Sequence, residues 1–229
     1  MPEHTLAAYL RALEDGADGL ECDVRLTRDG HLVCVHDATL RRTTNDRGRI
    51  SAMTLDELCR ITQMLTLEEL LTIATSAGRP LRLLVETKHP SRFGSAVEER
   101  LVELLRQFDL AGPKVSAADV RVTVMSFSPL AVRTVRGLAP ELDAVFLYEV
   151  GSPRVRDGRP PFGAGILGPG VGALRAHPEV VARAHGRGHR VYVWTVNTTE
   201  EIDFAAGLGV DGLISDRPAF VLSYLASRP

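Results

Sequence analysis

The sequence predicts an α/β fold in which strands and helices alternate around a mostly parallel sheet. Apolar runs typical of strands are followed by apolar residues at helical spacing, with short Gly- or Pro-marked turns between them. Such alternation suits a closed (β/α)8 barrel or an open doubly wound sheet. No GxGxxG or GxxxxGK[ST] motif follows the first strand, so the nucleotide-binding open sheet is disfavoured and the barrel is preferred.

The bulk composition predicts one compact domain over residues 1–229. The chain is 45% hydrophobic and 24% charged, which suits a sizeable core rather than a disordered chain. Its 27 Lys and Arg nearly balance its 29 Asp and Glu, so no positive field attracts nucleic acid or an anionic membrane. No apolar run is long enough for a transmembrane helix. We therefore expect a small-molecule partner; the oligomeric state is not readable.

Cysteine usage predicts a reducing compartment. Cys22, Cys34 and Cys59 form no CxxC pair and are odd in number, so neither a disulfide framework nor a zinc site is indicated. The N-terminus lacks the basic-then-apolar layout of a secretory signal. We expect a cytoplasmic location, provided that no signal precedes Met1.

The first quarter of the chain predicts a helix and then a hairpin. Apolar residues at helical spacing and a glycine stop define the helix: Leu6, Leu10, Leu13 and Gly16. A strand over 19–26 follows. The dipeptide Asp29-Gly30 is a strong tight-turn signal that returns the chain into residues 31–36. These two runs are expected to pair as a hairpin or as an extension beyond the sheet.

The remaining elements follow the same rhythm. Capping boxes at Thr54 with Glu57, at Thr66 with Glu69 and at Thr198 with Glu201 predict three helix starts. Segment 151–165 is rich in Pro, Gly and Arg and is expected to be a mobile loop without regular structure. Further strands are expected at 81–87, 120–127, 144–148, 165–167, 190–196 and 212–215. Further helices are expected at 94–108, 129–138, from 177 to about 186 or 188, from 198 to about 208, and at 218–225. If residues 31–36, which follow the hairpin turn, are not counted, this gives seven strands, one fewer than a closed (β/α)8 barrel needs.

Acidic residues stand where a barrel strand would present its side chains to the interior. Strand side chains alternate, so Glu21 and Asp23 project together while Cys22 points the other way. Buried carboxylates cost several kcal/mol unless a cation or hydrogen bonds compensate. Glu86 ends the apolar run LRLLVETK, and Lys88 shares its face. Three oxygen donors can hold Mg²⁺ or Ca²⁺, and a lysine beside them can contact a phosphate.

Each of these residues also has a purely structural reading. An E-x-D pattern is common on solvated sheet faces, and a lone histidine such as His36 is more often a surface or core residue than a catalyst. Lys88 would ordinarily be a solvated strand end, and Trp194 in VYVWTVN a core or rim aromatic. The conjunction of these residues, more than any single one, predicts a site.

The ordered motifs P-E-x-T, E-x-D, H-D, E-x-K, S-F and W-T-V-N resemble those of the glycerophosphodiester phosphodiesterases. They stand here in PEHT, ECD, HD, ETK, SF and WTVN, and the likeness covers nearly the whole chain. The resemblance implies a TIM-type (β/α)8 barrel that hydrolyses glycerophosphodiesters to sn-glycerol 3-phosphate and an alcohol. It also implies a divalent metal, usually Ca²⁺ or Mg²⁺, and a role in lipid and glycerol metabolism.

The resemblance also implies roles for seven residues. The family's metal ligands are matched by Glu21, Asp23 and Glu86. The histidine that acts as general acid toward the leaving alcohol is matched by His36. An acid near the site is matched by Glu3, a lysine beside the phosphate by Lys88, and an aromatic in the glycerol pocket by Trp194. His4 stands where the family's P-E-N-T element has Asn.

One family motif precedes the region that this chain matches. Family members have a strand ending in H-R-G, with a first catalytic histidine, just before P-E-N-T, whereas this chain starts at Met1-Pro2-Glu3. Either the true start lies upstream or the chain is a degenerate relative, and the persisting site residues favour the first. We expect a barrel lacking its first strand, with two unsatisfied strand edges, low stability and little activity.

Two other functions compete with this interpretation. One is a non-catalytic relative that binds phosphodiesters or a partner without turning them over. The other is a barrel lyase or aldolase that uses the same acids to hold Mg²⁺ against an enolate. Turnover of a phosphodiester that depends on His36 would separate both from the hydrolase.

Overall fold

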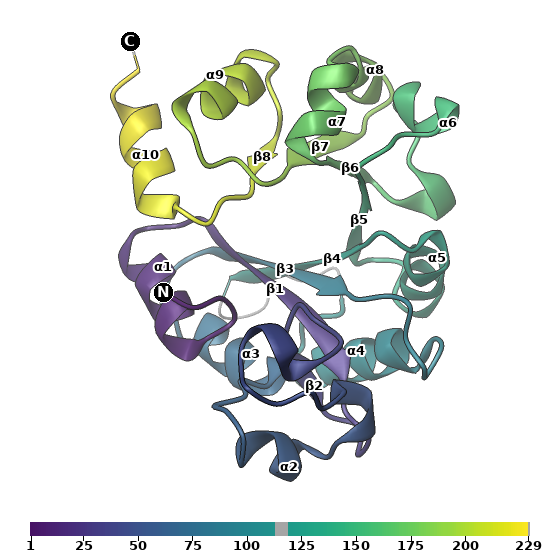
Figure 1. The fold of residues 1–229 in the computed structure, drawn as a ribbon. Coiled ribbons are helices and arrows are strands. Elements are labelled where there is room, and N and C mark those ends of the chain that lie inside the picture. The colour runs from purple at the N-terminus through teal and green to yellow at the C-terminus, as the bar shows by residue number, and fades with distance from the viewer. Residues whose placement is uncertain (113–118, 229) are drawn as a thin grey trace.

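The protein is built around one curled sheet with helices on its outer side (Figure 1). The computed structural model describes residues 1–112 and 119–228. The sheet has the order β2-β1-β3-β4-β5-β6-β7-β8, and all neighbours from β1 to β8 are parallel. The strands are β1 Gly19–Leu26, β2 Leu32–Cys34, β3 Leu81–Thr87, β4 Val120–Ser126, β5 Asp143–Tyr148, β6 Ile166–Pro169, β7 Arg190–Val193 and β8 Gly212–Leu213. The predicted (β/α) barrel with seven parallel strands is confirmed.

Helices follow the strands in sequence and cover the outside of the sheet (Figure 1). They are α1 Leu6–Glu14, α2 Leu55–Cys59, α3 Leu67–Thr75, α4 Ala96–Gln107, α5 Pro129–Leu138, α6 Pro153–Arg156, α7 Val171–Ala176, α8 Val180–His185, α9 Thr199–Gly207 and α10 Pro218–Ala226. The described residues also form the short 3-10 helices η1 Leu40–Arg42, η2 Ile50–Ala52 and η3 Pro161–Gly163. All three predicted capping boxes are present, at the starts of α2, α3 and α9. Each box satisfies backbone N–H groups that would otherwise lack a partner.

The predicted hairpin joins β1 to β2. Gly30 has φ +85°, a conformation that suits glycine in a tight turn, and the Thr27 N–H donates to the His31 carbonyl at 2.9 Å. The strands then pair antiparallel, with Val24 opposite Cys34. The Val35 N–H donates to the Asp23 carbonyl at 2.9 Å, so the returning chain stays beside β1 up to His36.

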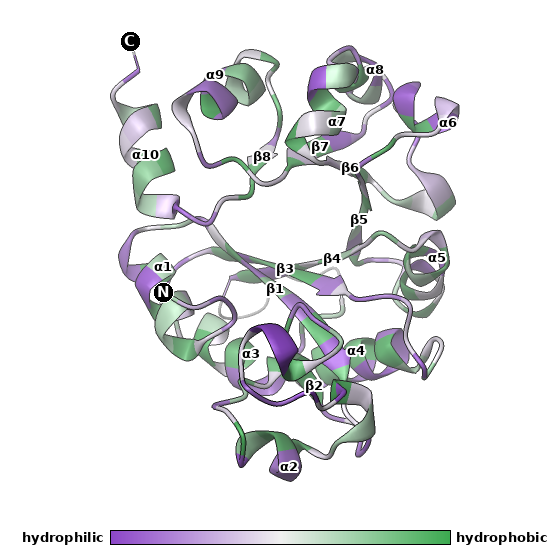
Figure 2. Ribbon diagram, in the orientation of Figure 1, coloured by the Kyte–Doolittle hydropathy of each residue, from purple (hydrophilic) through white to green (hydrophobic). Residues whose placement is uncertain are grey.

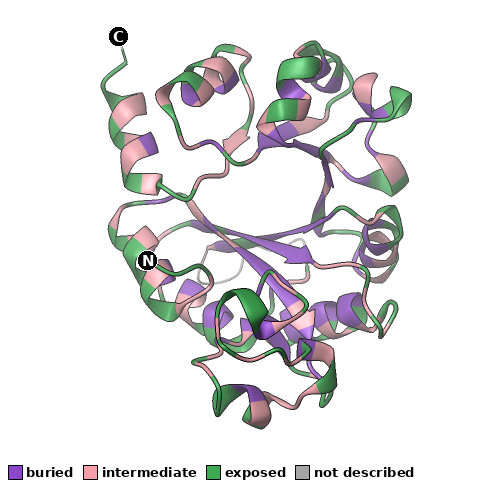
Figure 3. Ribbon diagram, viewed as in Figure 1, coloured by how far each residue is buried: buried purple, intermediate pink, exposed green. Residues whose placement is uncertain are grey.

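The two faces of the sheet pack into different environments. On β1, Leu20, Cys22 and Val24 join the large core cluster that lies beneath the helices. The alternate residues face the barrel interior, where Leu84 of β3 packs with Met125 and other apolar residues of the strands. The strands are largely buried while the outer turns of the helices are exposed (Figure 3). Hydrophilic residues accordingly concentrate on the helices and loops (Figure 2).

Two details of the sequence interpretation need correction. Segment 151–165 was expected to lack regular structure, but it contains α6 and η3. Pro153 stands at the first position of α6, after the N-cap Ser152, where proline starts a helix rather than breaking it. In α1, Leu6 and Leu10 are 47% and 43% exposed, because the helix packs on the core mainly through the buried Tyr9.

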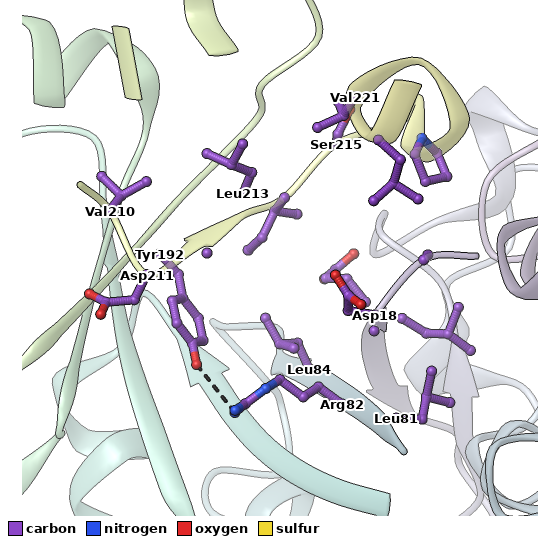
Figure 4. Close-up of a pocket in the computed structure, with 18 of the residues that line it drawn as sticks. Asp18, Leu81, Arg82, Leu84, Tyr192, Val210, Asp211, Leu213, Ser215 and Val221 are labelled. Atoms are coloured by element: carbon purple, nitrogen blue, oxygen red, sulfur yellow. Dashed lines mark hydrogen bonds between the residues drawn. The ribbon is translucent and has the colours of Figure 1, made fainter. Parts of the chain in front are cut away.

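The sheet stays open between β1 and β8. In the described part of the chain no strand pairing joins them, and β2 pairs only with Val24–Leu26, leaving the first part of β1 with β3 as its sole neighbour. A cavity of about 1090 Å³ separates the two edges. Figure 4 shows Leu213 and Ser215 on one side of it and Asp18 and Leu81 on the other. The barrel is therefore one strand short of closure, as its strand count predicts.

None of the helices described here combines the length and apolar character that crossing a membrane requires.

Candidate active site

A second cavity gathers the residues that the sequence singles out. It has a volume of about 710 Å³ and lies at the carboxyl ends of β1 and β3, where barrel folds carry their sites. All seven predicted site residues line it: Glu3, Glu21, Asp23, His36, Glu86, Lys88 and Trp194. Residues far apart in the sequence thus share one pocket, although they play different parts in it.

Three carboxylates form the centre of the pocket. Glu21, Asp23 and Glu86 each offer one oxygen, and these oxygens lie within 4.8 Å of one another. The parallel register explains the convergence, because Asp23 is the direct partner of Glu86 and Glu21 lies two residues earlier on the same face of β1. Asp23 and Glu86 are buried and Glu21 is half-buried. The structure thus brings the three acids together.

Lys88 lies among these acids. Its Nζ is 2.8 Å from Glu86 Oε1 and 3.1 Å from Asp23 Oδ1, and only 11% of its side chain is exposed. The sequence pattern placed Lys88 correctly on the face of Glu86. In this structure its ammonium group pairs with two carboxylates, so any contact with a phosphate would be made from this buried, hydrogen-bonded position.

One lysine does not balance the negative charge of the cluster. Burial, reinforced by the charge of Asp23, raises the pKa of Glu86 to about 7 despite the opposing effect of Lys88. Burial and the charges of Asp23 and Glu86 also raise the pKa of Glu21 well above its ordinary value. For Asp23, burial alone would raise the pKa, but the hydrogen bond from His4 and the charge of Lys88 bring it below its usual range. The negative charge of the cluster therefore favours the binding of a further positive charge.

The donor set fits a hard divalent cation. Carboxylate oxygens are the ligands that Ca²⁺ and Mg²⁺ prefer, and a bound cation would favour the charged forms of Glu21 and Glu86. Glu21, Asp23 and Glu86 would hold it, since they form the group of metal-competent oxygens found in the described residues. The same ligand type accepts either cation.

His36 stands at the rim of the pocket and is held by a neighbouring acid. Its Nδ1 lies 2.8 Å from Asp37 Oδ1, and 53% of its side chain is exposed. Arg42 Nε donates to the other Asp37 oxygen at 2.6 Å. Arg25 Nε donates to the His36 carbonyl at 2.9 Å. With Nδ1 engaged by Asp37, the Nε2 atom is the one available to exchange a proton.

Glu3 belongs to the rim rather than to the carboxylate cluster. Arg42 Nη1 donates to Glu3 Oε2 at 3.1 Å, and Arg42 Nη2 contacts the other oxygen. These hydrogen bonds lower the pKa of Glu3. Arg42 therefore ties the start of the chain to the Asp37–His36 pair.

An aromatic pair forms the apolar wall of the pocket. Trp194 is half-buried, and its indole Nε1 donates to the Gly168 carbonyl at 2.9 Å. Phe127 packs edge-on against it, with ring centroids 5.4 Å apart, and remains 41% exposed. Both rings line the same cavity as the acids.

Sequence reasoning missed several residues that the structure brings to the site. His4 contacts Asp23, Tyr9 contacts His4, and Arg42 holds Asp37. The histidine in PEHT was visible as a departure from P-E-N-T, and the acid in HD was adjacent to His36. Nothing local in the sequence singles out Tyr9 or Arg42, because their partners are set by the fold.

The comparisons with known proteins agree with this geometry. A model of the Glycerophosphoryl diester phosphodiesterase family matches residues 1–220. The chain is 42% identical to "Probable glycerophosphodiester phosphodiesterase 1" of Mycobacterium tuberculosis, over 98% of this chain and 88% of that protein. It is 30% identical to a glycerophosphodiester phosphodiesterase of Caldanaerobacter subterraneus, over 97% of this chain and 92% of that one.

A solved structure shares the fold. The glycerophosphodiester phosphodiesterase from Parabacteroides distasonis superposes with a TM-score of 0.82 at 26% identity, covering 98% of this chain and 90% of that one. The fold and the site thus define a phosphoric diester hydrolase on a TIM-type barrel. The chain belongs to the Glycerophosphoryl diester phosphodiesterase family. This membership favours hydrolysis over the lyase or aldolase alternative.

Proposed function

We propose that this protein hydrolyses glycerophosphodiesters to sn-glycerol 3-phosphate and an alcohol in a reaction that depends on Ca²⁺ or Mg²⁺. The observation that carries the proposal is the convergence of Glu21, Asp23 and Glu86 within 4.8 Å, in the cavity that His36 also lines. Family membership and the two curated relatives support the same reaction class.

The carboxylate cluster and Lys88 form the side of the pocket suited to the phosphate group. Glu21, Asp23 and Glu86 would hold a divalent cation there, which would supply positive charge to neutralise the phosphoryl oxygens. Lys88 is held by Glu86 and Asp23 and carries its positive charge into the same pocket, where low exposure strengthens its effect on an anionic ligand. Burial opposes protonation of Lys88, but the charge of Asp23 and the hydrogen bond to Glu86 outweigh it and raise the lysine's pKa. The ammonium group therefore stays protonated.

His36 supplies a proton to the leaving alcohol. A positioned general acid contributes about 10²- to 10⁴-fold in rate. Asp37 holds Nδ1 and fixes the ring, and Arg42 in turn orients Asp37. The exposed position of His36 suits contact with a leaving group that extends outward from the pocket.

Trp194 and Phe127 give the pocket an apolar side suited to the carbon skeleton of a glycerol moiety. The indole is fixed by its hydrogen bond to Gly168 and by the edge-on contact with Phe127. Such a wall binds substrate and transition state alike, so it contributes to binding more than to the chemical step.

We also propose a role in lipid and glycerol metabolism and a cytoplasmic location. The proposed products, a glycerol phosphate and an alcohol, are what breakdown of deacylated phospholipids would release. The location is supported by Cys22, Cys34 and Cys59, which are all free thiols, as a reducing compartment keeps them.

The test is release of sn-glycerol 3-phosphate from glycerophosphocholine. The purified chain is treated with EDTA, dialysed, and assayed with and without added Ca²⁺ or Mg²⁺. We expect whatever turnover the chain shows, even if it is low, to require added cation, and we expect Asp23→Asn to abolish it. Asp203→Asn is the matched control, because Asp203 pairs with Arg228 and Tyr224 on the surface, outside the cavity.

Two results would contradict the proposal. Undiminished turnover in EDTA would remove the metal from the mechanism. Cation binding without turnover, in a folded protein and also after extension upstream with an H-R-G strand, would instead identify a non-catalytic relative that retains the carboxylate cluster.

A further inference from the structure

His4 lies inside the site although it is close to the start of the chain. Only 11% of its side chain is exposed. Its backbone adopts φ +52°, a left-handed conformation that is unfavourable for a non-glycine residue. The next residue, Thr5, is the N-cap of α1, so the strained turn links the rim segment to the helix. In this conformation the imidazole of His4 reaches Asp23 on β1.

Both ring nitrogens of His4 have partners in the interior. Nε2 lies 2.9 Å from Asp23 Oδ2, and Nδ1 lies 2.8 Å from the Tyr9 hydroxyl. An ionised Asp23 can only accept, so Nε2 carries the proton. Tyr9 is 5% exposed, and burial raises its pKa, so its hydroxyl stays protonated and can pair with Nδ1. The two contacts hold the imidazole ring in one orientation.

The chain of hydrogen bonds ends on a carboxylate of the cluster. Asp23 Oδ1 is held by Lys88 and Oδ2 by His4, so the side chain is restrained from two sides. The two restraints come from different elements, since Lys88 follows β3 and His4 precedes α1. Second partners of this kind orient the ligands of metal sites and tune their affinity.

A role of His4 in merely anchoring the N-terminal segment explains less. That segment is already fastened by the contacts of Glu3 with Arg42 at the rim. The hydrogen bonds of His4, by contrast, run inward and join two buried residues, Tyr9 and Asp23.

We propose that His4 is a positioning residue whose Nε2–H group, oriented by the Tyr9 hydroxyl, fixes the Asp23 carboxylate and thereby sets the affinity of the carboxylate cluster for a divalent cation. The inference rests on the proposed metal-dependent function. It adds to that function a Tyr9–His4–Asp23 chain of hydrogen bonds.

The experiment measures cation binding without using activity. EDTA-treated wild-type protein and three variants, His4→Ala, His4→Gln and Tyr9→Phe, are titrated calorimetrically with Ca²⁺ and with Mg²⁺. Melting temperatures of the same samples are recorded in EDTA. Tyr9→Phe keeps the buried ring and deletes only the hydroxyl, so it tests the chain of hydrogen bonds even if His4→Ala folds poorly.

His185→Ala is the matched control. His185 Nε2 lies 2.8 Å from Asp211 Oδ2, a histidine–aspartate hydrogen bond of similar length that lies outside the carboxylate cluster. Its loss shows what such a bond contributes to thermal stability alone.

The expected pattern is a graded loss of affinity. Loss of a residue that orients a metal ligand costs about 10- to 100-fold in metal affinity, so His4→Ala should weaken binding by about that factor. Tyr9→Phe should weaken it less. His4→Gln, whose amide N–H can still donate to Asp23, should restore most of the affinity. His185→Ala should lower the melting temperature without changing cation affinity.

Two outcomes would overturn the inference. Wild-type affinity in both His4→Ala and Tyr9→Phe would show that Asp23 needs no such orientation. An equal loss in His4→Gln and His4→Ala would show that the donated hydrogen bond is not what matters. Absence of cation binding in the wild-type protein would instead count against the proposed metal-dependent function, which separates the two failures.

Discussion

Asp23 and Glu86 are direct partners in the parallel register of β1 and β3, and both are buried. Like charges opposite each other on neighbouring strands are destabilising, more so when buried. Lys88 bridges the pair at 3.1 and 2.8 Å, but Glu21 adds a third acid to the same group. The three carboxylates therefore lower the stability of the metal-free protein and form a site that attracts a cation.

Removing one charge from this pair should stabilise the metal-free protein. In Glu86→Gln the amide oxygen can still accept from Lys88, while the repulsion with Asp23 and Glu21 is lost. We expect the melting temperature in EDTA to rise by about 2–4 °C for each 1 kcal/mol relieved, and cation binding to weaken. Glu103→Gln, on the surface of α4 beside Arg100, is the control and should change neither quantity. A lower melting temperature specific to Glu86→Gln would contradict the repulsion argument.

The same repulsion predicts how stability depends on pH. The folded-state pKa of Glu86 is raised from 4.5 to about 7, so the folded protein binds more protons than the unfolded chain between these values. This contribution is fully present below pH 4.5 and is lost as the pH rises through 7. Glu21, whose pKa is also raised, adds to the same trend. In EDTA we therefore expect the free energy of unfolding to fall from pH 5 to pH 8.

Denaturant unfolding at several pH values checks this expectation. The decline should be shallower in Glu86→Gln, and added Ca²⁺ or Mg²⁺ should stabilise the protein more at pH 8 than at pH 5, because protons and the cation compete for the same oxygens. Stability that rises over this range in EDTA, or an identical slope in the variant, would count against the charge assignment.

The contribution of His36 to kcat should increase with the basicity of the leaving group. If it protonates the departing alcohol, His36→Ala should reduce kcat by about 10²- to 10⁴-fold for glycerophosphocholine. A phosphodiester with a nitrophenolate leaving group needs no such proton, so its turnover should fall far less. Steady-state assays of both substrates, with calorimetry to show unchanged cation affinity, make the comparison. Equal losses for the two substrates would refute the role of His36 as a general acid.

Local sequence patterns predicted most of the fold. Capping boxes, the Asp29-Gly30 turn and apolar runs depend on neighbours in sequence, so strands such as β1 and β3 were placed with their observed bounds. The bounds were less accurate where tertiary packing decides, as in β2 and β7, which are shorter than the apolar runs suggest. The helix α7 was missed, since its six residues carry no strong periodic signal.

The site was predictable as a set of residues but not as a network. Strand periodicity alone placed Glu21 with Asp23, and the ends of two strands brought Glu86 beside them. By contrast, the contacts of His4 and Arg42 span 19 and 39 residues of sequence and depend on how the hairpin and α1 pack. Patterns among neighbouring residues do not predict such distant contacts. The hydrogen bonds that orient the acids and His36 are therefore known only from the structure.

The open edges of the sheet predict self-association. In the residues described, the outer edge of β8 has no partner strand, and the first part of β1 has none on the edge away from β3; such edges template pairing with other chains. We expect the apparent mass in light scattering to rise with protein concentration at constant ionic strength. A constant monomeric mass up to high concentration would contradict this expectation.

The central claim is that Glu21, Asp23 and Glu86 bind one divalent cation together. The most direct measurement is anomalous diffraction from crystals soaked in Mn²⁺, which carboxylates accept in place of Mg²⁺ or Ca²⁺. We predict a single strong anomalous peak about 2.0–2.6 Å from an oxygen of each of the three carboxylates, the range found for oxygen ligands of hard cations. The peak should be absent in Asp23→Asn. No peak at this position in the wild-type crystal, with the site accessible to solvent, would contradict the account.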